Sequence, residues 1–321
     1  TREENLNCVR ISVPAPMHRI LGFYLPSVLS RVVRAEIKKL KPDLVHAHAA
    51  RPAGVIAKYA LTNSDIPYVL TEHSGPIQAF WWTAHGKRQI AQSYEKSQRL
   101  FAVSNFLKSE MLNHFGSAAA ATRVLYNGID TDLFRWLGPP PDKGKILFVG
   151  GLESTKGLNL LFTALAKVPN KFMWTLTIVG EGKLLRSLRK QASDLRIAAR
   201  IYWVGPVEQE SIPKIYSQHD FVVIPSVYET FSLVCAEALA CGRPVIASRC
   251  GGPEEVLPEG GGILIPNGDS AAMVEVLVKA LSGNFGFDAE KNIAHVENKF
   301  SLNRLVDKLE SVYADVIGFR G

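Results

Sequence analysis

Short apolar runs alternate with amphipathic stretches along the chain, and this alternation limits the possible folds more than any other feature of the sequence. The apolar runs predict strands at residues 7–13, 43–49, 67–73, 99–104 and 122–128, and then at 145–151, 175–182, 200–206, 220–226, 243–248 and 261–266. The amphipathic stretches predict helices, among them residues 25–40, 158–168, 182–195, 211–219 and 270–281. Strands that alternate with helices predict parallel sheets covered by helices on both faces.

The segment RWLGPPPDKGK, residues 135–145, divides the chain into two halves. Its three prolines and two glycines stop both helix and strand, so it is predicted to be a linker. The predicted organisation is an N-terminal α/β domain at 1–137, a C-terminal α/β domain at 138–300, and a helix at 301–321 that is able to cross back to the first domain. In such doubly wound sheets, ligands bind at the carboxyl ends of the strands, where the strand order reverses.

The composition is that of a core-forming protein, since 47% of the 321 residues are hydrophobic and 21% are charged. No apolar run approaches the roughly 18–20 residues that are needed to span a bilayer. The four cysteines lack C-x-x-C spacing and lie in apolar segments, which favours buried free thiols in a reducing compartment: Cys8, Cys235, Cys241 and Cys250.

The net charge of +7 belongs entirely to the first part of the chain. Residues 1–144 contain 18 Lys and Arg against 11 Asp and Glu, whereas residues 145–321 contain 19 of each kind. The excess indicates contact with something acidic, such as a membrane surface or a phosphorylated substrate; the alternative is a generally basic surface.

Two Gly-bearing loops follow predicted strands of the second half. In FVGGLESTKGLNLL, backbone N–H groups at the helix start attract phosphate and Lys156 adds a positive charge, although the G-x-x-x-x-G-K-[ST] pattern of a P-loop is absent. In TLTIVGEGKLL, Gly180 and Gly182 allow a tight turn and the close approach of a ligand, but Leu185 occupies the last position of G-x-G-x-x-G. Taken alone, each loop is also explained as an ordinary βα turn.

Polar residues end two predicted strands of the first half. His46 and His48 lie at strand spacing on one face of the sheet, where they line a cleft or, with a further ligand, hold a metal. Glu72, His73 and Ser74 end the next strand. His73 is placed there to contact a ligand, to move a proton, or simply to hydrogen-bond within its turn.

Asp130 and Asp132 form a D-x-D pattern, and such a pair is able to hold a divalent metal against a nucleotide diphosphate. Because this pair directly follows a strand and precedes the linker, a turn that caps the interdomain crossover is favoured.

Glu237 stands in SLVCAEALA, a run that otherwise has the character of a buried helix, and Glu229 lies eight residues earlier. Thr230 is predicted to cap a helix that opens at Phe231, which leaves Glu229 just outside the positive end of that helix. At 100° per residue the two carboxylates are about 80° apart around the helix, so both are able to border one cleft. An ionised Glu237 among apolar neighbours needs strong donors, such as the hydroxyls of a vicinal diol; the alternative is a solvent-facing stripe.

The segment PSVYETFSLVCAEALACGRPVIASRCGGPEEV resembles the E-x7-E signature of retaining GT-B glycosyltransferases, a large family that includes bacterial mannosyl- and glucosyltransferases. Between Pro42 and Leu281 the family's other motifs occur in the same order: PDLVHAHA, IPYVLTEHS, FAVSNFLKSEM, LYNGIDTDLF, GLESTKGLNLL, TIVGEGKLLRSL and GILIPNGDSAAM. The resemblance implies two doubly wound parallel-sheet domains that face a cleft.

The resemblance also implies an activity and its partners. A hexose-type sugar would pass from a nucleotide-diphosphate donor to a glycan or lipid-linked acceptor, with retention of anomeric configuration. The setting would be cytoplasmic, at the inner face of the plasma membrane, in the assembly of cell-surface polysaccharide or glycolipid. The family needs no tightly bound metal and no other cofactor, and nucleic acid is not a partner.

The matching positions carry roles that the resemblance supplies. Glu237 would hydrogen-bond the donor's ribose, Glu229 would face the transferred sugar, and Lys156 would neutralise the diphosphate as the nucleotide leaves. His73 would lie across the cleft, near the sugar and the acceptor. The remaining donor-binding positions would be loop residues and helix N–H groups: Gly151, Gly180, Glu181, Pro206, Val207, Thr230, Phe231, Ser232, Leu233 and Val234.

Two departures from the family pattern bear on activity. Gly151 stands where the family usually has the arginine of G-R-L. The lost charge-assisted contact costs about 1.5–3 kcal/mol unless Arg249 or Arg51 replaces it. The strand, Gly-rich loop and helix that open the family's first domain precede anything in this sequence, so an abbreviated N-terminal domain without its first strand is expected.

Three functions remain open at this point. The first is the retaining glycosyltransferase, and the second is a nucleotide-sugar-binding protein with reduced or no transferase activity, which Gly151 favours. The third is a glycoside hydrolase with Glu229 and Glu237 as acid and nucleophile. A retaining hydrolase needs carboxyl groups about 5–5.5 Å apart across the scissile bond, and two glutamates at one helix mouth fit that requirement poorly.

Two segments bear on the acceptor because they mix apolar and basic residues: residues 19–42, and residues 78–88 with Phe80, Trp81 and Trp82 beside Lys87 and Arg88. Both suit an anionic membrane surface or a lipid-linked acceptor. Core or interdomain packing also explains the two tryptophans.

Overall fold

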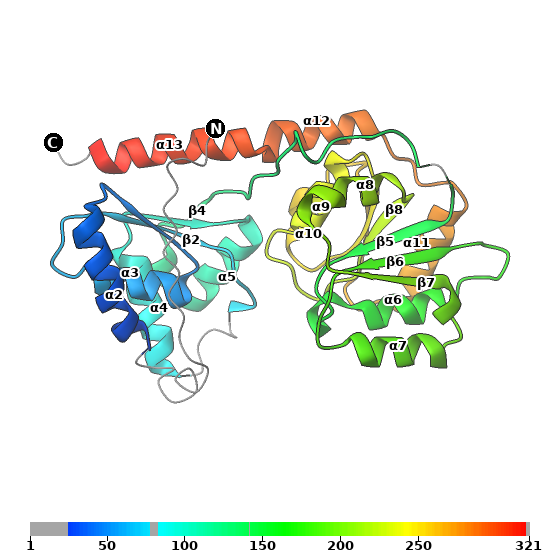
Figure 1. Cartoon of the computed structure of the whole chain (residues 1–321), viewed down its shortest axis with the longest axis horizontal. Helices are drawn as coiled ribbons and strands as arrows, with labels where there is room; N and C mark the ends of the chain where they lie inside the picture. The colour runs from blue at the N-terminus through cyan, green and yellow to red at the C-terminus, as the bar shows by residue number, and fades with distance from the viewer. Residues whose placement is uncertain (1–24, 78–82, 141, 319–321) are drawn as a thin grey trace.

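The computed structural model describes residues 25–77, 83–140 and 142–318. The strand expected at 7–13, Cys8 and the aromatic residues 80–82 lie outside these ranges. Each of the other expected strands is present, and all of them pair in parallel in two separate sheets (Figure 1).

The first sheet has the order β1-β2-β3-β4 and is formed by β1 (Val45–His48), β2 (Tyr68–Glu72), β3 (Arg99–Ala102) and β4 (Arg123–Val124). The second has the order β10-β9-β8-β5-β6-β7 and is formed by β5 (Lys145–Val149), β6 (Thr175–Val179), β7 (Ile201–Gly205), β8 (Phe221–Ile224), β9 (Val245–Ser248) and β10 (Gly262–Ile265). The chain enters the second sheet at β5, builds outward to β7, and then returns to β8 on the other side of β5. The strand order therefore reverses between β5 and β8, and the loops that leave these two strands flank the switch point.

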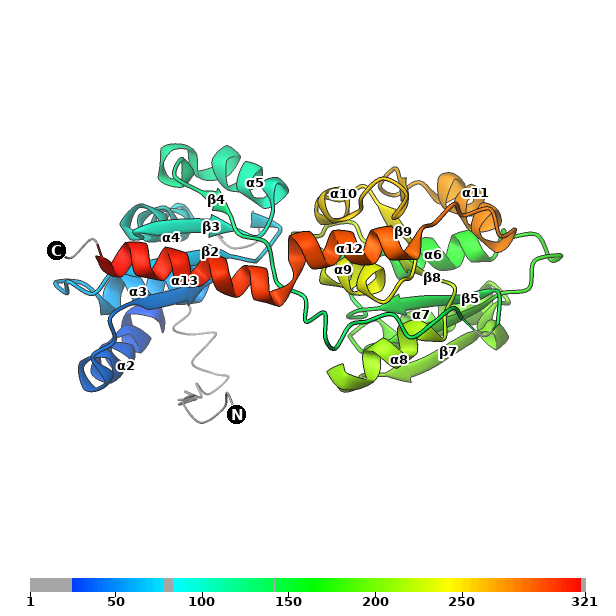
Figure 2. The same cartoon turned by 90° about the horizontal axis from the view of Figure 1, so that it is seen from above.

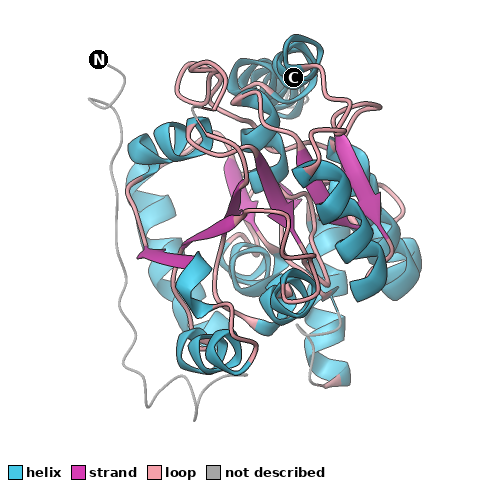
Figure 3. Ribbon diagram, turned by 90° about the vertical axis from the view of Figure 1, so that its right-hand side faces the viewer, coloured by secondary structure: helices cyan, strands magenta, loops and turns pink. Residues whose placement is uncertain are grey.

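Helices pack around each sheet (Figure 1), and the end-on view shows helices surrounding the strands (Figure 3). The first domain contains α2 (Leu25–Leu40), α3 (Val55–Ala60), α4 (Ala84–Lys96) and α5 (Asn105–Phe115). The second contains α6 (Leu158–Leu165), α7 (Leu185–Asp194), α8 (Ile212–Ser217), α9 (Leu233–Ala240), α10 (Gly252–Val256), α11 (Ser270–Leu281) and α12 (Ala289–Phe300). Side-chain caps begin several of them, as where Ser104 Oγ accepts from Leu107 N and opens α5.

The last helix, α13 (Leu302–Gly318), follows α12 directly and runs along the first domain (Figure 2). Val316 packs with Val69 and Phe101 of the first sheet, and Leu305, Leu309 and Val312 lie against the same cluster. At the turn between α12 and α13, Leu302 N donates to Ile129 O over 2.8 Å. The segment that leads into the linker and the junction of α12 with α13 are the two places where the chain passes between the domains, and they therefore lie side by side.

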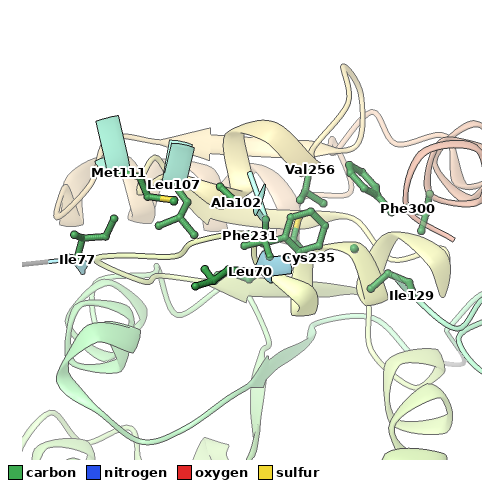
Figure 4. Close-up of a cluster of buried hydrophobic side chains, with 14 of the residues drawn as sticks. Leu70, Ile77, Ala102, Leu107, Met111, Ile129, Phe231, Cys235, Val256 and Phe300 are labelled. Carbon is green, nitrogen blue, oxygen red and sulfur yellow. The ribbon is translucent and has the colours of Figure 1, made fainter. Parts of the chain in front are cut away.

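A shared apolar cluster joins the domains beside these crossings. Figure 4 shows its side chains packed together, from the first domain Leu70, Ile77, Ala102, Leu107 and Met111, and from the second Phe231, Cys235, Val256 and Phe300. Polar contacts border it: Glu255 accepts from Asn105 N and from Tyr126 OH, each over 2.7 Å. Because these contacts come from segments that follow the carboxyl ends of β3, β4 and β9, they bring the carboxyl edges of the two sheets toward each other.

Candidate active site

Lys156 and Glu229 meet at the switch point of the second sheet. Lys156 ends a short helical turn after β5, and Glu229 lies in the loop after β8. Lys156 Nζ is 2.7 Å from Glu229 Oε1, and Ser226 Oγ donates to the same oxygen over 2.8 Å. The glutamate side chain is 14% exposed and the lysine 31%, so the carboxylate is held inside the loop while the ammonium keeps access to solvent.

The backbone around Glu229 is fixed by the loop that leaves β9. Glu229 N donates to Cys250 O over 3.1 Å, and Gly252 N donates back to Glu229 O over 2.8 Å. A Cβ on Gly252 would lie 2.3 Å from a backbone atom of Phe231, so only glycine fits this close approach. The loops after β8 and β9, which hydrogen-bond to each other, therefore fix the position of the Glu229 carboxylate.

The predicted start of the next helix is wrong. Helix α9 begins at Leu233, and its N-terminal cap position is Ser232, which has φ 73° and makes no side-chain capping bond. Thr230 instead presents its carbonyl to Ser104 Oγ of the first domain. The physical reason is that Phe231 is buried in the interdomain cluster, which diverts the chain before the helix begins.

Glu237 lies one turn inside α9 and is half-buried, so it does not belong to a solvent-facing stripe. Tyr216 of α8, itself fully buried, donates its hydroxyl to Glu237 Oε2 over 3.0 Å. Burial raises the pKa of the Glu237 carboxyl, and the Tyr216 hydrogen bond acts in the opposite direction. A carboxylate has room for further donors beside this one.

The loops after β5 and β6 are joined backbone to backbone. Leu152 N donates to Glu181 O over 2.9 Å, and a Cβ on Gly180 would lie 2.1 Å from Gly150 O. Gly151 differs from these glycines, because a Cβ there would meet its nearest atoms only at 3.8 and 3.9 Å. The packing therefore requires Gly180 but would accept a side chain at Gly151.

The other predicted donor positions border the same edge of the second sheet. Glu181 is exposed, Pro206 is exposed just beyond the end of β7, and Val207 is half-buried against the shared cluster. At the start of α9, Leu233 is 44% exposed and Val234 is half-buried. These residues lie at the same edge of the sheet as Lys156 and Glu229, because the carboxyl ends of parallel strands all lie at one edge.

On the first domain, Glu72 holds the loop that carries His73. Its carboxylate is almost fully buried and accepts from the backbone N–H groups of His73 and Ser74, each over 3.0 Å. Ala50 N also donates to it over 2.9 Å. Burial and then the charge of His48 lower the pKa of His73 to about 4, so the ring is neutral near pH 7.

Tyr228 connects this loop to the loop of Glu229. Its ring occupies the space beside Gly75, where a Cβ would lie 2.2 Å from a ring carbon, and it contacts the ring of Phe106 with centroids 5.3 Å apart. The His73 loop and the Glu229 loop therefore face each other across the interdomain boundary. Sequence reasoning missed Tyr216, Ser226 and Tyr228, since nothing in their spacing marks them as neighbours of either glutamate.

Arg249 and Arg51, which were considered as replacements for the family arginine that is missing at position 151, lie in different parts of the structure. Arg249 is exposed and lines an interdomain groove of about 620 Å³ together with Tyr228 and Asn267. Arg51 is half-buried and lines a small cavity with Glu72 on the first domain.

The acidic pair before the linker forms a turn, as favoured from the sequence. Asp130 Oδ1 accepts from the backbone N–H groups of Asp132 and Leu133, each over 3.1 Å. Among residues 25–77, 83–140 and 142–318, His, Cys, Asp and Glu side chains form no group of three or more that could hold a metal ion. Within those ranges, too, every helix is too short or too polar to cross a bilayer.

Comparison with known proteins agrees with this architecture. Residues 130–299 match the family model described as glycosyl transferases group 1, and residues 1–133 match that of glycosyltransferase family 4. The uncharacterized glycosyltransferase MJ1607 of Methanocaldococcus jannaschii is 30% identical over 303 residues, covering 85% of this chain and 75% of that protein. The D-inositol 3-phosphate glycosyltransferase of Mycobacterium tuberculosis strain F11 is 27% identical, covering 97% of this chain and 70% of that protein.

Solved structures show the same fold. Sucrose-phosphate synthase from Thermosynechococcus elongatus superposes with a TM-score of 0.83 at 22% identity, covering 96% of this chain and 81% of that one. The structure of Anabaena HepE in complex with UDP and glucose superposes with a TM-score of 0.77 at 20% identity, covering 95% of this chain and 84% of that one. The two parallel sheets thus form a GT-B fold, and the chain belongs to the group 1 glycosyltransferases.

Proposed function

We propose that the protein transfers a hexose-type sugar from a nucleotide-diphosphate donor to a glycan or lipid-linked acceptor, with retention of anomeric configuration and without a resident metal. The observation that carries this proposal is the Lys156–Glu229 pair at the switch point, with Glu237 on the helix that follows. Loops with backbone N–H groups and a lysine, which suit a phosphate, lie beside the carboxylates of Glu229 and Glu237. Glu229 is paired with Lys156 and Glu237 accepts from Tyr216, and this arrangement suits a nucleotide sugar better than a simple glycoside. Family membership also removes the support for a hydrolase.

Each donor part has a chemically matched partner in this proposal. The ribose diol donates to Glu237, whose half-buried carboxylate accepts from Tyr216 and has room for further donors. The diphosphate lies against the N–H groups that begin α9 and against the Lys156 ammonium. The transferred sugar lies beside Glu229, and the loop of His73 forms the opposite wall.

The base and sugar are proposed from the neighbours. Because Anabaena HepE is solved with UDP and glucose, and sucrose-phosphate synthase shares the fold, UDP-hexoses are the first donors to test. A thermal-shift screen of UDP, GDP and ADP sugars identifies the donor, since a ligand that binds only the native state raises its melting temperature. Transfer assays with the best donor then test turnover, and failure of every nucleotide to bind would contradict the proposal.

A donor-binding protein with little or no turnover is the second candidate, and Gly151 favours it. Stabilisation by a nucleotide sugar without release of nucleoside diphosphate in the presence of glycan or lipid-linked acceptors would support this candidate. Robust transfer would exclude it.

Replacing Gly151 by arginine is expected to strengthen nucleotide-diphosphate binding by about tenfold, because one charge-assisted contact contributes about 1.5–3 kcal/mol and part is lost to solvent. The position is open to a side chain. Titration calorimetry measures the change. Gly180→Ala is the control, since its Cβ would meet Gly150 O and the variant should lose stability without gaining affinity. Unchanged affinity with a stable fold would mean that the diphosphate lies elsewhere.

We further propose that the basic first domain contacts an anionic membrane at the inner face of the plasma membrane, where lipid-linked acceptors and cell-surface glycans are assembled. Helix α2 exposes Val28 and Val32, each 42% exposed; its last turn carries exposed Lys38, and exposed Lys41 follows directly after the helix. Apolar side chains beside lysines are the features that bind anionic interfaces.

Binding to phosphatidylglycerol vesicles is expected at low salt and should be lost as salt screens the lysines. Cosedimentation measures it, with phosphatidylcholine vesicles as the uncharged control. Lys38→Glu with Lys41→Glu should reduce binding several-fold, whereas Lys190→Glu on the second domain should leave it unchanged. No association at low salt would remove the membrane proposal without touching the donor site.

A further inference from the structure

Helix α5 lies at the side of the first domain that faces α10 (Figure 2), and its N-terminal end contacts the residues on both sides of Glu229. The ring of Phe106 lies against the ring of Tyr228, with centroids 5.3 Å apart. Ser104, which is fully buried, donates its hydroxyl to the carbonyl oxygen of Thr230. Because Tyr228 and Thr230 are the neighbours of Glu229 in the chain, the first domain holds the backbone on each side of this carboxylate.

The same end of α5 contacts the loop after β9, which hydrogen-bonds to the Glu229 backbone. A Cβ on Gly251 would lie 2.4 Å from ring atoms of Phe106 and 2.6 Å from Glu229 O, so this glycine is enclosed between the ring and the glutamate. Glu255 follows on α10, and its carboxylate accepts from Asn105 N over 2.7 Å and from the Asn105 side-chain amide. Both loops that fix Glu229 are therefore held by one end of α5.

The contact between Asn105 and Glu255 gives this boundary its direction. Apolar packing in the shared cluster attracts the domains but is non-directional, whereas hydrogen bonds to a carboxylate are short and oriented. Tyr126 OH is a further donor to Glu255, over 2.7 Å, and it also comes from the first domain. A carboxylate at the N-terminal end of a helix is favoured by the helix dipole as well. Glu255 therefore sets how α5, and with it the first domain, is placed on the two loops.

We propose that Asn105 and Glu255 are positioning residues for sugar transfer, which hold the two loops so that the Glu229 carboxylate stays against Lys156. Both residues line the interdomain groove, and they act on the Lys156–Glu229 pair through the backbone. Turnover needs this pair in place, whereas binding of the nucleotide needs groups of the second domain alone. The assignment of Glu229 and Lys156 to transfer rests on the proposed function.

Asn105→Asp tests the contact without changing the shape of the side chain. It places a second carboxylate against Glu255, while α5 itself tolerates the change because a negative charge suits the first turn of a helix. We expect kcat to fall by about 10–100-fold, since a reacting group that is misplaced by about 1 Å loses up to that much. The affinity for UDP, measured by calorimetry, should be unchanged, because its binding groups are on the second domain.

Combining Asn105→Asp with Glu255→Gln should restore the contact. The new amide donates to the new carboxylate, and its oxygen still accepts from the backbone N–H of residue 105. The double variant is expected to recover kcat to within about threefold of the wild type, the signature of two residues that act on each other. Asn113→Asp is the matched control, because it introduces the same charge at an exposed position near the other end of α5 and should keep wild-type kcat.

Wild-type kcat in Asn105→Asp would overturn the proposal. So would a loss of kcat that the double variant does not recover, or one that is matched by an equal loss of UDP affinity. If the wild type bound no nucleotide and transferred no sugar, the proposed function would fail instead. The coupling between positions 105 and 255, measured by thermal unfolding of the ligand-free variants, would then decide on its own whether this contact joins the domains.

Discussion

Lys156→Met is expected to lower kcat by about 10²–10³-fold while the affinity for the donor changes much less. In the proposed function the lysine faces a diphosphate whose negative charge would grow as the sugar leaves, and removing one such preorganised partner costs about that factor. Its ammonium is already placed by Glu229 over 2.7 Å, so no reorganisation is needed at the moment of reaction. Steady-state transfer kinetics, with kcat and KM determined separately, measure the effect.

Lys190→Met is the matched control, because Lys190 also forms an ion pair, with Asp194 over 2.6 Å, but on the exposed surface of α7. That variant should keep wild-type kinetics. Combining Lys156→Met with Glu229→Gln should cost much less than the two separate losses together, since paired groups act as a unit. A wild-type kcat in Lys156→Met would show that the leaving group is neutralised by another cation.

Glu237→Gln is expected to weaken nucleotide-diphosphate binding by about 10–150-fold, which corresponds to the 1.5–3 kcal/mol of hydrogen bonds to a charged acceptor. Stability should not fall. A carboxyl whose pKa is raised by burial lowers the stability of the fold at pH values above its ordinary pKa, and glutamine removes that cost. The amide still accepts from Tyr216. Titration calorimetry and thermal unfolding at pH 7 measure the two effects.

Tyr216→Phe provides the control for packing around Glu237. It removes the protein's own donor but leaves the carboxylate, so affinity should change less than about threefold while the melting temperature falls. Wild-type affinity in Glu237→Gln would mean that the carboxylate is structural and that the ribose binds elsewhere.

The strands and several helices could be read from local patterns because each depends on nearby residues. Helix α11 has the bounds expected from the sequence, since Asp269 caps it and an apolar face runs through it. Gly180 was expected to allow a tight turn and the close approach of a ligand; in the structure it is Gly150 O of the neighbouring loop that occupies the space of its missing side chain. Helix α9 was misplaced for the converse reason: Phe231 packs into the other domain, and no local signal reports a contact at that separation.

The sequence by itself determined the two α/β halves, the loops at the strand ends and the spacing of the two glutamates, because these follow from hydrophobic period and chain order. Only the tertiary structure decided which partners the charged and polar groups have. Glu229 pairs with Lys156, 73 residues away, and His48 with His73, 25 residues away. The physical reason is that the carboxyl ends of parallel strands share one edge, so residues far apart in the chain meet there once the sheet order is set.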